Sequence, residues 1–472
     1  MDLFQSFLYK FEQEEYFHAE LGNCNLIFQR CLELLTNLLY EKAGDCLAPN
    51  PNCSRKRPKL ELPQPKNNVI STTDNAHTKI NTQGTNSLTG LINGSIQELS
   101  EYLKDYSELQ ISSDIYSKAK ACWLKLYSDS CTVLGIYSGL EGRSWEVVKE
   151  NLVEPYLEPL VPNDCIRGAI KYLDLAIVIS GAPEWRLSKI KKLIKYYETI
   201  FGLHSDIDLR ESKPFFAKKD ENFENLVKFP IKRYKVSPSV LEFAAIINKE
   251  DCEPFVIENA MESVPALKRW NDVNYLKYAV GKYRLVPIEI GSKYTDESWT
   301  QKLLYFGEYL DMVVDDKQKD VYLAQHNLFK QSDALVQDFT PPDYCFVEPR
   351  CLQASSGKKP GKNCCGNTDL VSNIWLGPEN SISPLHTDDF YNVFAQVVGF
   401  KYVKLVHQKY SEFVYPYKTT LLGNTSRVDA EHPNLADFPN FENVEYGDSI
   451  LGPGDLLYIP VLALLSIIVE QH

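Results

Sequence analysis

Apolar residues recur at two different spacings along the chain, and the change in spacing divides it into parts. From residue 2 to residue 42, and again from about residue 88 to residue 201, they return every three or four positions, which predicts amphipathic helices. From about Lys228 onward they form short β-branched and aromatic runs separated by Gly, Pro and Asn, which predicts strands. We therefore expect an α+β protein, with helices first and a β-rich domain after them.

The second helical stretch contains five segments with helical spacing. They are Ile96–Tyr106, Ile115–Leu126, Trp145–Leu157, Ile166–Ser180 and Trp185–Phe201. The chain breaks at Gly181-Ala-Pro183 before the last of them. No repeat of fixed period is present, so the pattern predicts a helical bundle, with the task of binding a partner or covering the next domain.

The β-rich part contains eight candidate strands. They are Phe255–Ile257, Leu285–Ile290, Val321–Gln325, Asn373–Leu376, Ser383–His386, Tyr391–Val398, Lys401–Val406 and Leu456–Ile459. Gly399-Phe400 predicts a tight hairpin between two of them. Many short strands at regular spacing are typical of a sandwich or a barrel.

The segment from residue 46 to residue 89 differs from both parts. It is rich in Pro, Asn, Ser and Thr and poor in apolar residues, which predicts a disordered linker. This segment contains Arg55-Lys56-Arg57-Pro58-Lys59. The cluster is either a nuclear import signal or a solvated basic segment that no receptor recognises. The predicted organisation is therefore residues 1–45 as helices, 46–89 as linker, 90–227 as a helical domain and 228–472 as the β-rich domain.

Charge and cysteine content narrow the function classes. The 472 residues carry a net charge of −13, which disfavours binding of nucleic acid by the whole surface. The first ten residues do not resemble a secretory signal, and the longest apolar run, Tyr458–Val469, is too short to span a bilayer, so we expect a soluble intracellular protein. The cluster Cys345, Cys351, Cys364 and Cys365 is either a set of scattered reduced thiols or a metal or redox site.

One group of residues indicates chemistry. Ser383-Pro-Leu-His386-Thr-Asp388 places a histidine and an aspartate two positions apart, on one face of a strand. One imidazole and one carboxylate could then reach the same metal, as in the two-histidine-one-carboxylate triad of Fe(II) oxygenases. Alone, the tripeptide is common by chance.

The surrounding sequence resembles a JmjC domain from about Lys228 to Pro460. It resembles most the branch of that family called lysine-specific demethylase eight, also described as an arginyl hydroxylase. The residues that carry the resemblance are Asn373-Ile-Trp-Leu-Gly377-Pro, Ser383-Pro-Leu-His386, Val397-Val-Gly399-Phe-Lys401, Val286-Pro-Ile-Glu-Ile-Gly291, Tyr322-Leu-Ala-Gln325-His326, Pro342-Asp343-Tyr-Cys345, Leu422-Gly-Asn424-Thr-Ser426 and Leu451-Gly-Pro453-Gly454-Asp455.

The resemblance implies a double-stranded β-helix that binds Fe(II) and 2-oxoglutarate. His386 and Asp388 match two iron ligands, and Lys401 matches the base that holds the distal carboxylate of 2-oxoglutarate. Asn392, Ser383 and Tyr322 match polar partners of this cosubstrate. The implied reaction uses O2, yields succinate and CO2, and either hydroxylates a side-chain carbon or removes an N-methyl group as formaldehyde.

The chain departs from the family pattern after Pro460. By spacing, Leu465 occupies the position of the second iron-binding histidine, and the closing strands of the family do not follow. Three possibilities stay open at this point: His472 serves as the ligand instead, the ending is an altered reading of the gene, or the protein is a genuine pseudo-enzyme. We also expect the edge beside Leu456–Ile459 to be unpaired, and residues 348–368 to form a loop at the rim of the site.

Two function classes therefore remain open. The first is a nuclear, chromatin-linked oxygenase that acts on histone methyl-lysine or on arginine of a partner protein, without sequence-specific nucleic-acid binding and without a membrane. The second is a binding module whose β-domain has lost catalysis. An arginine substrate needs carboxylates, whereas methyl-lysine needs an aromatic cage, and the composition favours neither.

Overall fold

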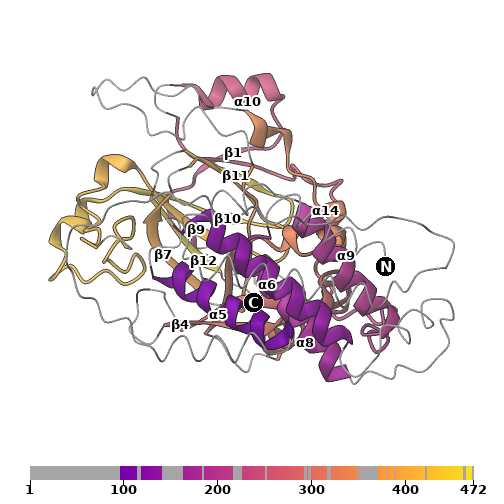
Figure 1. Ribbon diagram of the computed structural model, residues 1–472. Coiled ribbons are helices and arrows are strands. Elements are labelled where there is room, and N and C mark those ends of the chain that lie inside the picture. The colour runs from indigo at the N-terminus through magenta and orange to yellow at the C-terminus, as the bar shows by residue number, and fades with distance from the viewer. Residues whose placement is uncertain are drawn as a thin grey trace, which may run out of the picture. The chain divides into compact units, whose positions relative to one another are not determined.

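The computed structural model describes residues 96–113, 119–140, 163–182, 185–215, 226–249, 252–291, 295, 299–315, 320–347, 349, 370–379, 381–388, 390–419, 422–460 and 464–469. The expected N-terminal helices, the linker with its basic cluster, the helix over 145–157, most of the segment 348–368 and His472 lie outside these residues. The chain divides into two compact units between Phe201 and Gly202 (Figure 1). The predicted boundaries at residues 89 and 227 stay predictions.

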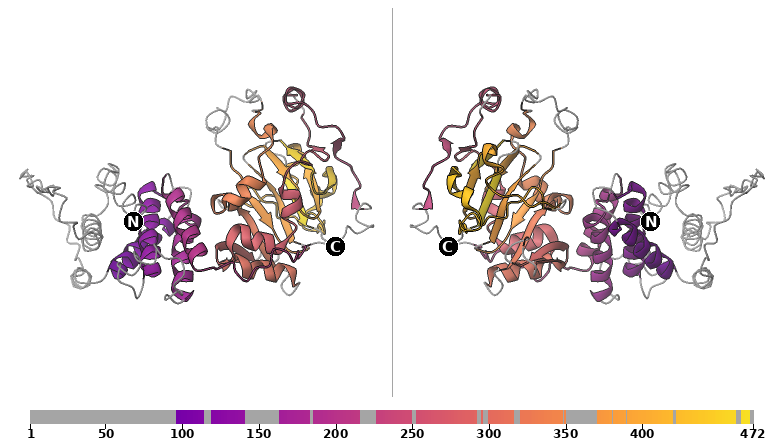
Figure 2. Two further views of the ribbon diagram at one scale, coloured as in Figure 1. Left: turned by 90° about the vertical axis from the view of Figure 1, so that its right-hand side faces the viewer. Right: turned by 90° about the vertical axis from the view of Figure 1, so that its left-hand side faces the viewer.

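The described part of the first unit consists of helices that lie side by side (Figure 2). They are α5 (Ile96–Ser112), α6 (Ala121–Leu140), α8 (Asn163–Val178) and α9 (Trp185–Ile200). The expected helix over 115–126 was placed too early, because α6 begins at Ala121 and runs on to Leu140. Within this unit the Arg186 guanidinium forms a buried two-point ion pair with Asp129, at 2.6 and 3.0 Å. No described helix is long and apolar enough to cross a bilayer.

The second unit contains three four-stranded sheets among its described residues. The first has the order β1-β2-β11-β8 and the second β10-β9-β12-β7. Their bounds are β1 (Lys232–Tyr234), β2 (Phe255–Ile257), β11 (Leu456–Ile459), β8 (Asn392–Ala395), β10 (Tyr446–Leu451), β9 (Lys401–Val406), β12 (Leu464–Val469) and β7 (Ser381–Thr387). The third, β4-β3-β5-β6, joins β4 (Thr300–Tyr305), β3 (Leu285–Ile290), β5 (Val321–His326) and β6 (Ile374–Leu376).

Helices and short helical turns complete the second unit. The longer helices are α10 (Val240–Ile247) and α13 (Phe306–Val314). The shorter ones are α11 (Ala266–Arg269), α12 (Val273–Leu276), η4 (Lys277–Gly281), η5 (Leu328–Lys330), α14 (Asp333–Asp338), η6 (Asp343–Phe346), η7 (Gln408–Tyr410) and η8 (Pro439–Asn443). Ser239 caps α10 reciprocally with Glu242, which fixes where that helix starts.

The first two sheets enclose an apolar core. Val403 and Leu405 of β9 and Leu451 of β10 pack in one buried cluster with Val256 of β2 and Leu457 of β11. Since alternate residues of a strand share a face, Lys401 lies on the same side of β9 as Val403 and Leu405. The fold therefore directs a lysine toward an apolar interior.

Two sequence expectations are wrong. Gly399 and Phe400 do not close a hairpin, because β8 pairs with β11 in one sheet whereas β9 pairs with β10 and β12 in another. The edge beside Leu456–Ile459 is not open either, since β11 lies between β2 and β8. The run after Pro460 instead contributes β12, which is paired on both sides by β9 and β7.

Candidate active site

Strand β7 brings two of the predicted metal-binding residues together. His386 lies near the end of β7, and Asp388 follows directly after it. The His386 Nε2 and Asp388 Oδ1 atoms are 3.9 Å apart, so one ion placed between them could contact both. Nδ1 of His386 lies 2.7 Å from the carbonyl oxygen of Pro384, which leaves Nε2 as the nitrogen turned toward Asp388.

An irregularity in β7 lies between Ser383 and His386. Leu465 of β12 is opposite His386, and Ile467 is opposite Ser383, so three steps on β7 match two on β12. An extra residue of this kind is a β-bulge, which changes the face that the following side chains occupy. Without it, Ser383 and His386 would lie on opposite faces, as residues three apart normally do. Pro384, which lies between the two residues, is the sequence signal for this bulge, because proline inside a sheet is confined to edge strands, strand starts and bulges.

Tyr322 of β5 is held against Ser383. The Tyr322 hydroxyl is hydrogen-bonded to the Ser383 side chain, and burial raises its pKa above the ordinary value. The space for the Tyr322 ring depends on Gly377, where an added Cβ would overlap the ring and approach Ser381 Oγ to 2.8 Å. The third sheet thus delivers one polar group to the site, and a glycine on the segment after β6 makes room for it.

Asn392 begins strand β8 and contacts Asp388. Its Nδ2 donates a hydrogen bond of 2.7 Å to Oδ2 of Asp388, the oxygen that does not face His386. Two residues further along β8, on the same face, lies Phe394. Strand β8 therefore connects Asp388 to the neighbourhood of Lys401.

Lys401 starts strand β9, and its side chain is buried. The residue is only 6% exposed, and its Nζ lies 5.1 Å from the centre of the Phe394 ring. No carboxylate of the described residues lies within ion-pair distance, and burial lowers the pKa of this ammonium to about 7. A buried cation without a counter-charge is energetically costly, and the Lys401 site is therefore suited to bind an anion.

Glu289 is a second uncompensated charge near the site. It lies opposite Tyr322 in the pairing of β3 and β5 and accepts a hydrogen bond of 3.3 Å from Trp299 Nε1. Burial raises the pKa of its carboxyl, and no basic side chain of the described residues forms an ion pair with it. The sequence places Glu289 inside a family motif but gives no sign of its role.

The third metal ligand is missing from the described site. No group of three His, Cys, Asp or Glu side chains that could hold a metal occurs among the residues that the structure describes. The backbone position opposite His386 is filled by Leu465, and leucine has no donor atom for a metal. Of the four clustered cysteines, Cys345 is a free thiol, and the other three lie outside the described residues.

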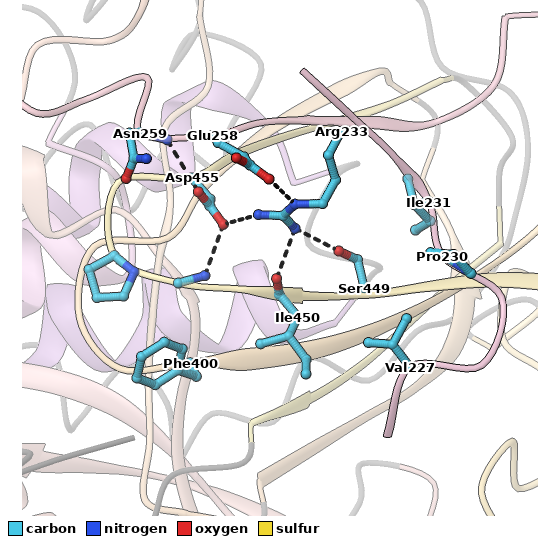
Figure 3. A pocket seen from close by; sticks show the side chains of 12 residues that line it. Val227, Pro230, Ile231, Arg233, Glu258, Asn259, Phe400, Ser449, Ile450 and Asp455 are labelled. Carbon is cyan, nitrogen blue, oxygen red and sulfur yellow. Dashed lines mark hydrogen bonds and ion pairs between the residues drawn. The ribbon is translucent and has the colours of Figure 1, made fainter. Parts of the chain in front are cut away.

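One cavity of the second unit is lined by other residues than these. Figure 3 shows this space of about 480 Å³ around Arg233 of β1. Its guanidinium donates to Glu258 at 2.6 Å and to Asp455 at 2.8 Å, and it also contacts Ser449 and the Ile450 carbonyl oxygen. These hydrogen bonds satisfy one another, so we interpret Arg233 as a structural residue. It links β1 to β10 and to the turn between β10 and β11.

Comparison with known proteins identifies the β-rich region. A family described as cupin-like domain matches residues 241–464. Lysine-specific demethylase 8 of Xenopus tropicalis is 39% identical over 210 residues, which are 44% of this chain and 44% of that protein. Lysine-specific demethylase JMJ30 of Arabidopsis thaliana is 38% identical over 211 residues, covering 44% of this chain and 45% of that protein.

A further relative carries the domain name itself. Jumonji C domain-containing protein 5 of Drosophila melanogaster is 35% identical over 229 residues, 48% of this chain and 53% of that protein. The chain spans about half the length of the curated relatives it matches. Residues 241–464 therefore match a cupin-like domain, and this part of the chain is similar to lysine-specific demethylase 8 and to proteins named after a JmjC domain.

Proposed function

We propose that the domain of residues 241–464 binds 2-oxoglutarate beside Lys401 and is the catalytic region of an oxygenase that acts on protein side chains. The observation that carries the proposal is the buried Lys401 ammonium, to which no carboxylate of the described residues is paired. The distal carboxylate of 2-oxoglutarate would supply the missing charge. Tyr322, Ser383 and Asn392 would offer hydroxyl and amide groups to the remainder of the cosubstrate.

The same proposal extends to the fold. The cluster shared by β9, β10, β2 and β11 supports two facing halves of a double-stranded β-helix. In that arrangement the inner faces carry the chemistry: Asn392 and Phe394 share one face of β8, and Phe394 contacts Lys401 of the other sheet. The helices α5, α6, α8 and α9 would form a separate bundle that recruits a partner.

His386 and Asp388 are the residues that would hold an Fe(II) ion. They offer an imidazole nitrogen and a carboxylate, two of the three ligands of the facial triad. Bound iron would supply the activation of O2 that oxidises 2-oxoglutarate together with a substrate. The described residues fit this ion incompletely, because Leu465 stands opposite His386.

Leu465 supports a second candidate function. Without a third ligand, the domain would bind metal weakly and would act as a catalytically impaired binding module that retains the anion site at Lys401. The oxygenase and the impaired binding module differ in whether position 465 supplies a metal ligand. Both would bind 2-oxoglutarate beside Lys401. A variant that supplies histidine at position 465 separates them.

Glu289 supports a cationic substrate side chain. A half-buried carboxylate without a basic partner among the described residues favours arginine or methylated lysine, the two substrates that the family resemblance implies. Its hydrogen bond from Trp299 adds an aromatic edge, so the pair would provide both a charge and an apolar surface. We propose a protein segment, such as a histone tail or an arginine-containing partner, as the substrate.

A nuclear, chromatin-linked role is the cellular part of the proposal. Two of the relatives are named lysine-specific demethylases, which supports a histone-associated setting. The cluster Arg55-Lys56-Arg57 would act as the import signal. A reporter fused to residues 46–89 should enter the nucleus, whereas the Arg55/Lys56/Arg57→Ala version should stay outside; equal distribution of both would refute this assignment.

The function is tested by succinate formation from 2-oxoglutarate with Fe(II) and ascorbate, followed by NMR. We expect little succinate from the unchanged chain and clear formation from Leu465→His. His386→Ala in the Leu465→His background serves as the matched control and should lose the activity again. Absence of succinate from a folded Leu465→His protein would contradict the oxygenase proposal, and vigorous turnover by the unchanged chain would contradict the impaired module.

A further inference from the structure

Phe394 lies between the buried Lys401 side chain and the exposed Trp375 ring. Its ring centre lies 5.1 Å from Lys401 Nζ and 6.3 Å from the ring centre of Trp375, which is 36% exposed on β6. It also packs against the apolar cluster that contains Val403 and Leu457. Phe394 is therefore the aromatic group between a buried ammonium and an indole that reaches the solvent.

The contact between the Phe394 ring and the Lys401 ammonium is a cation–π interaction. The face of an aromatic ring carries partial negative charge and attracts a cation, most strongly where water is excluded. This attraction leaves the N–H groups of the ammonium available, because the ring accepts no conventional hydrogen bond from them. A carboxylate arriving from another side could thus pair with an ammonium that is already positioned.

We infer that Phe394 is a positioning residue that orients the Lys401 side chain for the distal carboxylate of a 2-oxo dicarboxylate. This inference rests on the proposed binding of 2-oxoglutarate. Asn392 and Phe394 share one face of β8, so a single strand sets the geometry at Asp388 and at Lys401. The ring supplies affinity through Lys401 without contacting the reacting atoms.

The experiment is a calorimetric titration of the full chain with 2-oxoglutarate in the presence of Mn²⁺. Phe394→Leu keeps an apolar side chain of similar size and removes the ring, and it should weaken binding about tenfold, the effect of a desolvated cation–π contact. Phe394→Tyr retains the ring face and should bind within about threefold of the parent, because the cation–π attraction needs only that face. Phe438→Leu is the matched control, since it removes a ring that faces Arg427 at the surface, and it should leave the affinity unchanged.

A second ligand separates positioning from general damage. 2-Oxobutyrate lacks the distal carboxylate, so Phe394→Leu should leave its binding unaltered when this is followed by ligand-observed NMR. Equal loss for both ligands, unchanged affinity for 2-oxoglutarate in Phe394→Leu, or a Phe394→Tyr protein as weak as Phe394→Leu would each overturn the inference. A parent chain that binds no 2-oxoglutarate would instead overturn the proposed function on which it rests.

Discussion

Leu465 on β12 is paired through the backbone with His386 on β7. On its other side, β12 pairs with β9, the strand that begins with Lys401, so the position of Leu465 is fixed between the two strands that carry the candidate chemistry. A residue at this register position is a direct cross-strand neighbour of His386. Metal binding in this domain should therefore depend on the side chain at position 465.

Leu465→His should strengthen metal binding. A third donor beside His386 and Asp388 completes a facial triad, and loss of even an outer-shell partner typically costs 10–100-fold in affinity, so we expect a gain of about 100-fold or more. Mn²⁺ binding followed by electron paramagnetic resonance measures it. Leu464→His, one register position away and opposite Thr387, is the control and should give no gain. Equal Mn²⁺ affinity in all three proteins would refute the ligand assignment.

Lys401→Met should stabilise the protein near neutral pH. Burial lowers the pKa of Lys401 from 10.5 to about 7, so between these values the unfolded chain binds a proton that the folded chain has released. Stability therefore rises with pH across this window, and the cost of the buried ammonium is complete below pH 7. Removing the amine should raise the unfolding free energy at pH 7 by on the order of 4 kcal/mol.

The pH dependence provides the check on that prediction. Urea unfolding between pH 7 and pH 9.5 should show the advantage of Lys401→Met falling by about 1.4 kcal/mol per pH unit. A constant difference between variant and parent, or a variant that is less stable throughout, would mean that Lys401 is solvated or paired in solution.

Asp448→Ala should destabilise the second unit. The Asp448 carboxylate is fully buried and accepts hydrogen bonds from the backbone N–H groups of Lys228 and Phe229 and from the Tyr402 hydroxyl. Truncation leaves these donors unsatisfied, which should cost about 3 kcal/mol in urea unfolding. Asp437→Ala, which removes an exposed carboxylate, should change stability by less than about 0.5 kcal/mol. A similar loss in both variants would contradict the structural role of Asp448.

Glu289→Gln should reduce the response to a cationic peptide. In the Leu465→His background, arginine or methyl-lysine peptides should stimulate succinate formation, and the neutral amide should weaken that stimulation at least tenfold by removing the charge. Glu308→Gln changes an exposed carboxylate at the start of α13 and serves as control. Comparable stimulation in both variants would exclude Glu289 from substrate binding.

The central strands of the sheets were predictable from sequence. The observed bounds of β3, β9 and β11 coincide with the predicted ranges, because each is a short run in which aliphatic and aromatic residues predominate, bordered by turn residues. The exposed edge strand β4 and strand β10, which contains Gly447 and Asp448, were missed. Their pairing depends on tertiary contacts such as those of Asp448, which local propensity does not reveal.

The sequence predicted which residues belong to the candidate site better than it predicted how they are arranged in space. His386 and Asp388 could be paired from their spacing, and the structure places their side chains together. The bulge in β7 between Ser383 and His386, and the contact of Phe394 with Lys401, depend on register and packing between distant segments. Strand β12, with the sequence LLSIIV, does not alternate apolar and polar residues, so periodicity could not predict that it pairs between β9 and β7.

The central claim is that the buried Lys401 ammonium is the anchor for a 2-oxo dicarboxylate. Its most direct test is a calorimetric titration of 2-oxoglutarate into the full chain and into Lys401→Met, both with Mn²⁺ present. We predict binding of one equivalent by the parent and at least 100-fold weaker binding by Lys401→Met, since a desolvated charge pair is lost. No binding by the parent, or equal affinity in the two proteins, would contradict the account.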